Sequence, residues 1–149
     1  MNPFSIREAL LAKHAQHVVL IHFPIALFFA GVFFDLAARW TKRSTFAAAA
    51  YYNFLLAAIS TPAVVATGLL AWQLQLDGQT LRGILLQHLV VGVTASAMIC
   101  LVWYAHYRSR RAPVGKLPAY LLPMELVAAG VLGIAAHLGG YLSGVNIPG

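Results

Sequence analysis

Four long apolar stretches, separated by short polar segments, dominate the pattern of residues along the chain. They span residues 18–38, 47–72, 84–107 and 117–141. Each stretch is long enough to cross a hydrocarbon core, which requires about 20 helical residues. The pattern therefore predicts an all-α membrane protein whose single domain, residues 1–149, is a bundle of four transmembrane helices.

Residues 1–16 precede the first apolar stretch and have a different character. Ser5 and Glu8 have the spacing of a capping box, which predicts a short helix that begins near Ile6. Ile6 and Leu10 share one face of that helix. We therefore expect this N-terminal helix to lie along the outer membrane surface.

Composition supports the membrane class. Of the 149 residues 60% are hydrophobic and only 9% are charged. A soluble domain of this size would need several times more charge on its surface. We therefore expect the lipid bilayer to surround most of the chain.

The basic residues predict the orientation in the membrane. Of the ten lysines and arginines, most lie in the connections after the first and third stretches: Arg39, Lys42, Arg43, Arg108, Arg110, Arg111 and Lys116. By the positive-inside rule these two connections face the cytoplasm, so both termini are expected outside. The net charge of +6 is then a topology signal, and it gives no indication of nucleic acid binding.

The histidines are the candidate functional residues. Four of the six, contributed by three predicted helices, fall at nearly one depth: His17, His22, His88 and His137. A helical rise of roughly 25–33 Å separates each of them from the cytoplasmic basic residues. Ionisable side chains within a membrane usually mark a functional site, and no acidic residue is expected at this depth to form a proton relay. Neutral imidazoles can instead ligate a metal ion or a haem iron.

Small residues accompany three of these histidines. Ala26, Gly92 and Gly133 each lie one helical turn deeper in the membrane, on the face of His22, His88 and His137 respectively. Such strips could leave a flat apolar slot for a porphyrin, or they could let two helices pack closely. We favour the slot, because close packing does not explain why each strip ends in histidine.

The segment His17-Val-Val-Leu-Ile-His22-Phe-Pro-Ile-Ala-Leu27 resembles the HPxxxHFPIAL signature of a bacterial membrane family, domain of unknown function family 2231. Val18 departs from the proline of that signature. Thr67-Gly68-Leu69-Leu70, His88 and the segment 137–145, HLGGYLSGV, are similar to later segments of the family. The resemblance implies a small four-helix protein associated with haem or redox chemistry, with His17, His22, His88 and His137 as the family's histidines.

These observations lead to a hypothesis: a b-type cytochrome of the bacterial inner membrane that holds one or two haems between pairs of histidines on the outer side. A haem iron with two histidine ligands transfers electrons and has no position for a substrate, so a stand-alone enzyme is not expected. The expected partners are a periplasmic electron carrier or a larger respiratory or dehydrogenase complex.

Two other classes of function stay open. The same histidines could bind copper or zinc directly, or the chain could be an assembly subunit without redox chemistry whose strips pack against neighbours. Among the remaining polar residues, Asp35 is expected to pair with Arg39 one turn away. Glu125 could serve a quinol proton, which would make a quinone a partner, or accept a hydrogen bond from Asn53.

Overall fold

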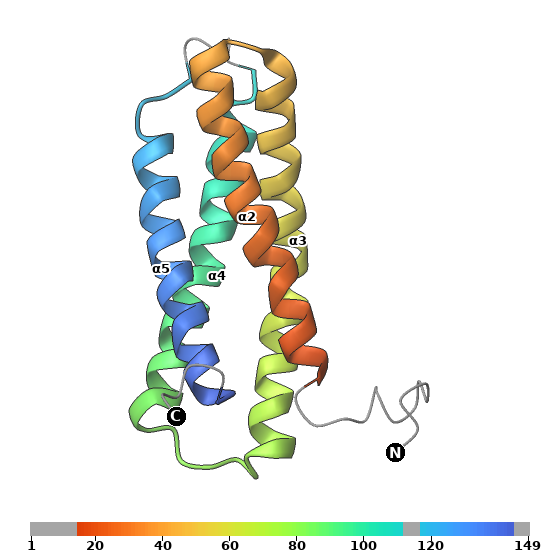
Figure 1. The fold of residues 1–149 in the computed structure, drawn as a ribbon, viewed down its shortest axis with the longest axis vertical. Helices are drawn as coiled ribbons and strands as arrows, with labels where there is room; N and C mark the ends of the chain where they lie inside the picture. The colour runs from red at the N-terminus through yellow and green to blue at the C-terminus, as the bar shows by residue number, and fades with distance from the viewer. Residues whose placement is uncertain (1–14, 112–116, 145–149) are drawn as a thin grey trace.

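The computed structural model describes residues 15–111 and 117–144, which form a bundle of long helices (Figure 1). The helices are α2 (Ala15–Thr41), α3 (Ser44–Gln75), α4 (Gly83–Ser109) and α5 (Leu121–Leu142). Each of them is long and apolar enough to cross a membrane. The described residues thus confirm the all-α fold with four candidate spans. The N-terminal surface helix, which is predicted to begin near Ile6, falls on residues outside the described part of the chain.

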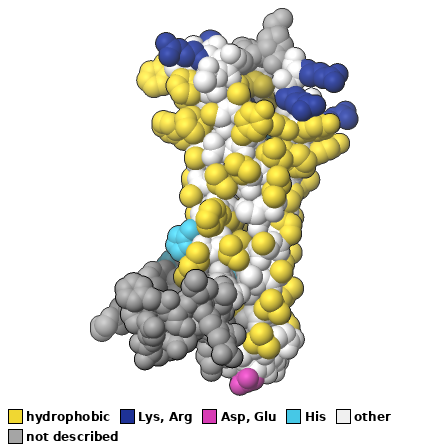
Figure 2. Space-filling view, turned by 90° about the vertical axis from the view of Figure 1, so that its right-hand side faces the viewer, with side chains coloured by type: hydrophobic (Ala, Val, Ile, Leu, Met, Phe, Trp, Pro, Cys, Tyr) yellow, Lys and Arg dark blue, Asp and Glu magenta, His cyan; other side chains and the backbone are white. Residues whose placement is uncertain are grey.

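The helices run up and down, so their connections alternate between the two ends of the bundle (Figure 1). The α2–α3 and α4–α5 connections lie at one end, whereas the α3–α4 connection, the start of α2 and the end of α5 lie at the other. Lysine and arginine side chains gather at the first end, and hydrophobic side chains cover the shaft (Figure 2). We call the half of the bundle nearest these basic side chains the basic half. The other half, which contains His17, His22, His88 and His137, is called the histidine half.

The observed helix ends differ from the predicted ranges by one to four residues, and two of these differences concern residues discussed above. Helix α2 begins at Ala15 rather than at residue 18, so Val18 lies within it. Helix α5 begins at Leu121 rather than at residue 117, because the chain turns at Pro118, whose carbonyl accepts a hydrogen bond from the Leu121 N–H (3.3 Å). Pro123 then occupies the first turn of α5, where a missing N–H removes no helical hydrogen bond.

The packed core lies in the basic half. The buried residues of the described chain fall within residues 24–38 of α2, 50–61 of α3, 95–109 of α4 and 121–135 of α5. In the described parts of the histidine half few residues are buried: Pro24 at its border, and Ala135, whose carbonyl lies beside His88. Helix α2 packs mainly on α3, and α4 mainly on α5. The four helices are therefore packed together in one half and only loosely associated in the other.

Phe54 is at the centre of the basic half. Its side chain is completely buried, and its ring lies 5.3 Å from that of Phe28, centroid to centroid. Gly31 on α2 makes this position possible, since a Cβ atom there would lie 2.6 Å from Cε1 of Phe54. The absence of a side chain at Gly31 therefore lets α2 approach the ring of Phe54 closely.

We expect Gly31→Ala to destabilise the protein, because the added methyl group collides with the ring of Phe54. Overpacking of this kind typically costs about 1–3 kcal/mol. The measurement is detergent-induced unfolding followed by circular dichroism. Gly130→Ala is the matched control, because a Cβ at Gly130 would meet nothing within 4 Å. Equal stability of the two variants would contradict the close approach of α2 and α3.

Candidate functional site

The four candidate histidines lie in the histidine half, beyond the buried core of their helices. From the basic ends of their helices they are separated by about 24–36 Å of helical rise, a wider spread than the sequence predicts. His22 and His137 are exposed on α2 and α5, whereas His17 and His88 are half-buried. On their helices, Ala26 and Gly133 are exposed and Gly92 is half-buried.

His22 and His88 use the same ring nitrogen in the same way. Nδ1 of His22 lies 2.6 Å from the carbonyl oxygen of Val18, and Nδ1 of His88 lies 3.2 Å from that of Ala135. A carbonyl oxygen can only accept, so Nδ1 carries the proton in both rings. In a neutral imidazole Nε2 then keeps its lone pair, and it makes no hydrogen bond within the described chain in either residue. Metal-ligating histidines are commonly oriented by such a bond.

His17 and His88 each pack against a glycine of a neighbouring helix. A Cβ at Gly68 of α3 would lie 3.0 Å from Cε1 of His17, and Nδ1 of His17 is 3.2 Å from the hydroxyl oxygen of Thr67. A Cβ at Gly139 of α5 would lie 3.1 Å from Cε1 of His88. The structure thus brings His17 to the Thr67–Leu70 segment and His88 to the segment that begins at His137.

Open space lies beside the predicted slot residues. A Cβ at Gly92 or at Gly133 would meet no atom within 4 Å. These glycines are therefore not used for packing between the helices of the described chain. Room for a ligand, for lipid or for another chain remains at both positions.

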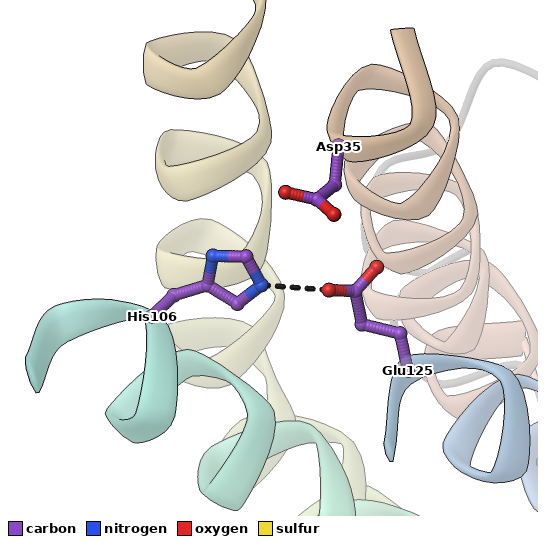
Figure 3. A group of neighbouring side chains, drawn as sticks. All are labelled: Asp35, His106 and Glu125. Carbon is purple, nitrogen blue, oxygen red and sulfur yellow. Dashed lines mark hydrogen bonds and ion pairs between the residues drawn. The ribbon is translucent and has the colours of Figure 1, made fainter. Parts of the chain in front are cut away.

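The structure does not gather the four histidines into a site for a bare ion. Among the described residues, three potential metal ligands with donor atoms close together are found elsewhere. They lie in the basic half and are Asp35, His106 and Glu125. All three side chains are buried, and their donor atoms lie within 4.8 Å of one another. Figure 3 shows the carboxyl groups of Asp35 and Glu125 turned toward each other, with the imidazole of His106 beside them.

Three different helices supply this cluster, which we call the Asp–His–Glu cluster. Nε2 of His106 on α4 is 2.8 Å from Oε1 of Glu125 on α5. The ring of His106 lies 4.7 Å from that of Phe54, centroid to centroid, so α3 forms a wall of the cluster. Asp35 on α2 pairs with Arg39, which confirms the predicted ion pair.

Of the two roles left open for Glu125, the hydrogen bond from Asn53 is not formed. Asn53 donates to the Ala49 carbonyl of its own helix (2.9 Å), and the partner of Glu125 is His106. The sequence pattern failed here because it began the last helix at residue 117, which placed Glu125 too deep. Once α5 begins at Leu121, Asp35, His106 and Glu125 all lie within about two turns of the basic ends of their helices. That shared depth was the signal that could have grouped them.

This fold defines a multi-pass membrane protein built from four apolar helices. The chain belongs to the family described as predicted membrane protein, DUF2231, whose family model matches residues 13–145. No curated protein and no solved structure matches the chain significantly. The family assignment confirms the resemblance read from the histidine motif, and it assigns no activity.

We expect Gly139→Ala to displace the imidazole of His88, because the added methyl group would lie only 3.1 Å from its Cε1 atom. The bond from Nδ1 to the Ala135 carbonyl should lengthen, and the measurement is the ¹⁵N NMR shift of the His88 ring in detergent micelles. Gly130→Ala is again the control, about 13 Å away along α5. Unchanged His88 shifts in Gly139→Ala would contradict the contact.

Proposed function

We propose that the histidine half binds a b-type haem between two histidines and that the protein transfers electrons. The observation that carries this proposal is that Nδ1 of both His22 and His88 is hydrogen-bonded to a backbone carbonyl. Each donates Nδ1–H to a backbone carbonyl and so presents the lone pair of Nε2 as a ligand atom. We assign these two residues as the first ligand pair, with His17 and His137 as the remaining histidines of the site.

Haem is favoured over a directly bound copper or zinc ion by the number of ligands that each requires. A structural zinc site needs four protein ligands and a catalytic one needs three. The described histidines do not supply three donor atoms within reach of one another. A haem iron receives four nitrogen ligands from its porphyrin and needs only two from the protein.

The loose packing of the histidine half supports the same choice. A porphyrin needs a flat apolar space, and the positions beside Gly92 and Gly133 are open. Few of the described residues of this half are buried, so a haem would also supply the apolar contacts that the helices do not make with each other. The competing view, an assembly subunit without redox chemistry, requires another chain to fill this space.

A bis-histidine haem has no open coordination position, so the chemistry that it would supply is one-electron transfer. The residues of the chain would bind it, orient the two imidazoles and exclude water. The helices of the described chain are joined by short connections, so we infer that the electron donor and acceptor belong to partners. A periplasmic carrier or a larger respiratory or dehydrogenase complex of the bacterial inner membrane fits this role.

The orientation of the chain is part of the proposal. With Arg39, Lys42 and Arg108 in the cytoplasm, the histidine half faces the outer side of the membrane. We expect a reporter that is active only outside to work when it is fused after Gly149 and to fail when it is inserted near Arg110. The reverse pattern would refute the outer position of the histidines.

The haem proposal is tested by the absorption spectrum of the purified protein, oxidised and then reduced with dithionite. The wild type should show the spectrum of a bis-histidine b-type haem, and His88→Ala should lose most of it. Gly92→Leu should lose haem as well while His88 remains, because the leucine fills the space that the porphyrin needs. Since a Cβ atom at Gly92 would meet nothing within 4 Å, we expect Gly92→Leu to fold without haem.

Thr94→Leu is the matched control for Gly92→Leu. Thr94 is exposed on the same helix, about 200° around it from Gly92, so a leucine there faces away from the proposed slot. We expect this variant to keep its haem. A wild type without haem and with bound copper or zinc would favour the metal alternative. Full haem content in Gly92→Leu would show that the slot is elsewhere.

A further inference from the structure

The Asp–His–Glu cluster lies outside the proposed haem site, and its chemistry is different. We propose that Asp35, His106 and Glu125 bind one divalent ion of a first-row transition metal, such as Zn²⁺, Mn²⁺ or Fe²⁺. The proposal does not depend on haem binding, because the cluster is in the basic half and shares no residue with the histidine half. Its support comes from burial, unpartnered oxygens, charge and donor type.

Burial with unpartnered oxygens is the first support. Glu125 is 0% exposed and Asp35 is 1% exposed. Within the described chain, Oε2 of Glu125 and Oδ1 of Asp35 are buried without a hydrogen-bond partner. A buried carboxyl oxygen without a partner is unfavourable, because it has lost its hydrogen bonds to water and gained none from the protein. A cation between the two carboxyl groups would remove this cost at both oxygens.

Geometry is the second support. The donor atoms of the three residues lie within 4.8 Å of one another, and Nε2 of His106 is 2.8 Å from Oε1 of Glu125. Adjacent ligands of an octahedral ion with bonds of 2.0–2.1 Å are separated by about 2.9 Å. The His106–Glu125 distance therefore already matches one edge of such a site. A dication would take the place of the proton between these two atoms.

The charges also fit a dication. Two carboxylates and a neutral imidazole carry a total charge of −2, which one divalent ion balances in the low-dielectric interior. Arg39 bonds the remaining oxygen of Asp35 from the edge of the cluster, and its side chain is 22% exposed. Within the described chain, Nη2 of Arg39 is buried without a hydrogen-bond partner, so its positive charge also acts on the cluster.

The donor types select the class of metal. Two oxygens and one imidazole nitrogen suit zinc, iron and manganese, whereas Cu(I) prefers sulfur ligands and Ca²⁺ prefers oxygen ligands alone. The ring of Phe54 packs against His106 and limits how that imidazole can turn. Three protein ligands leave further coordination positions for water or for a small anion.

The experiment uses Co²⁺ as a coloured probe with the full-length protein in detergent after treatment with a chelator. We expect the wild type to bind one Co²⁺ per chain with visible absorption bands. Glu125→Gln keeps the shape of the side chain and a hydrogen-bonding oxygen but removes a charge. It should weaken Co²⁺ binding by at least about tenfold. Removing a residue that only hydrogen-bonds to a metal ligand typically weakens metal binding by about 10–100-fold, and Glu125 would be a ligand itself.

Two control variants separate this site from other carboxylates and from the haem proposal. Asp77→Asn removes a carboxylate at the opposite end of the bundle, and asparagine tolerates the positive φ of 48° at that position. His88→Ala removes a proposed haem ligand. Both should bind Co²⁺ like the wild type, so loss of Co²⁺ in His88→Ala alone would place the ion at the histidine half and overturn the proposal.

A measurement on the wild type covers the case in which Glu125→Gln fails to fold. With Mn²⁺ bound, pulsed electron paramagnetic resonance should detect coupling to an imidazole ¹⁴N nucleus, and Asp35→Asn should abolish tight binding. Absence of stoichiometric Co²⁺ and Mn²⁺ binding in the wild type would overturn the proposal. The cluster would then hold a proton rather than a metal ion.

Discussion

The solvent around this protein is hydrocarbon, so its apolar side chains gain little by leaving the lipid for the protein interior. Close packing and buried polar contacts must hold the helices together instead. In the described chain both are concentrated in the basic half. Gly31 lets α2 approach the ring of Phe54, and that ring in turn packs against Phe28 and His106. The contacts made by Phe54 are the ones on which the arrangement of the other helices depends.

The buried Asp–His–Glu cluster follows from this packing. Buried ionisable groups are costly in a membrane unless they pair or face a cavity. Here His106 and Glu125 pair across α4 and α5, and Asp35 pairs with Arg39 along α2. Because the surrounding core is close-packed, the two carboxyl groups are held near one another even though they carry the same type of charge. That combination makes the cluster a candidate for cation binding.

The histidine half has the opposite character, since its helices are loosely packed and its histidines are half-buried or exposed. The family motif can be understood through its contacts. His17 needs a residue as small as Gly68 on α3, and His88 needs Gly139 on α5. Both imidazoles are therefore held in place by segments that are far away in the sequence. A closely packed basic half with an open histidine half is consistent with the proposal that a cofactor is held between the helices.

The sequence by itself determined the number of spans, the all-α class, the separation of basic residues to one end and the membership of the family. These features depend on composition and on local periodicity, which can be read directly from the apolar stretches and the basic residues between them. It also predicted the Asp35–Arg39 pair, because residues four apart on a helix are neighbours whatever the fold. Only the tertiary structure decided that Glu125 meets His106, since that contact depends on where α5 begins and on how α4 and α5 face each other. Contacts between helices are set by side-chain packing across the interface, which no pattern within a single helix encodes.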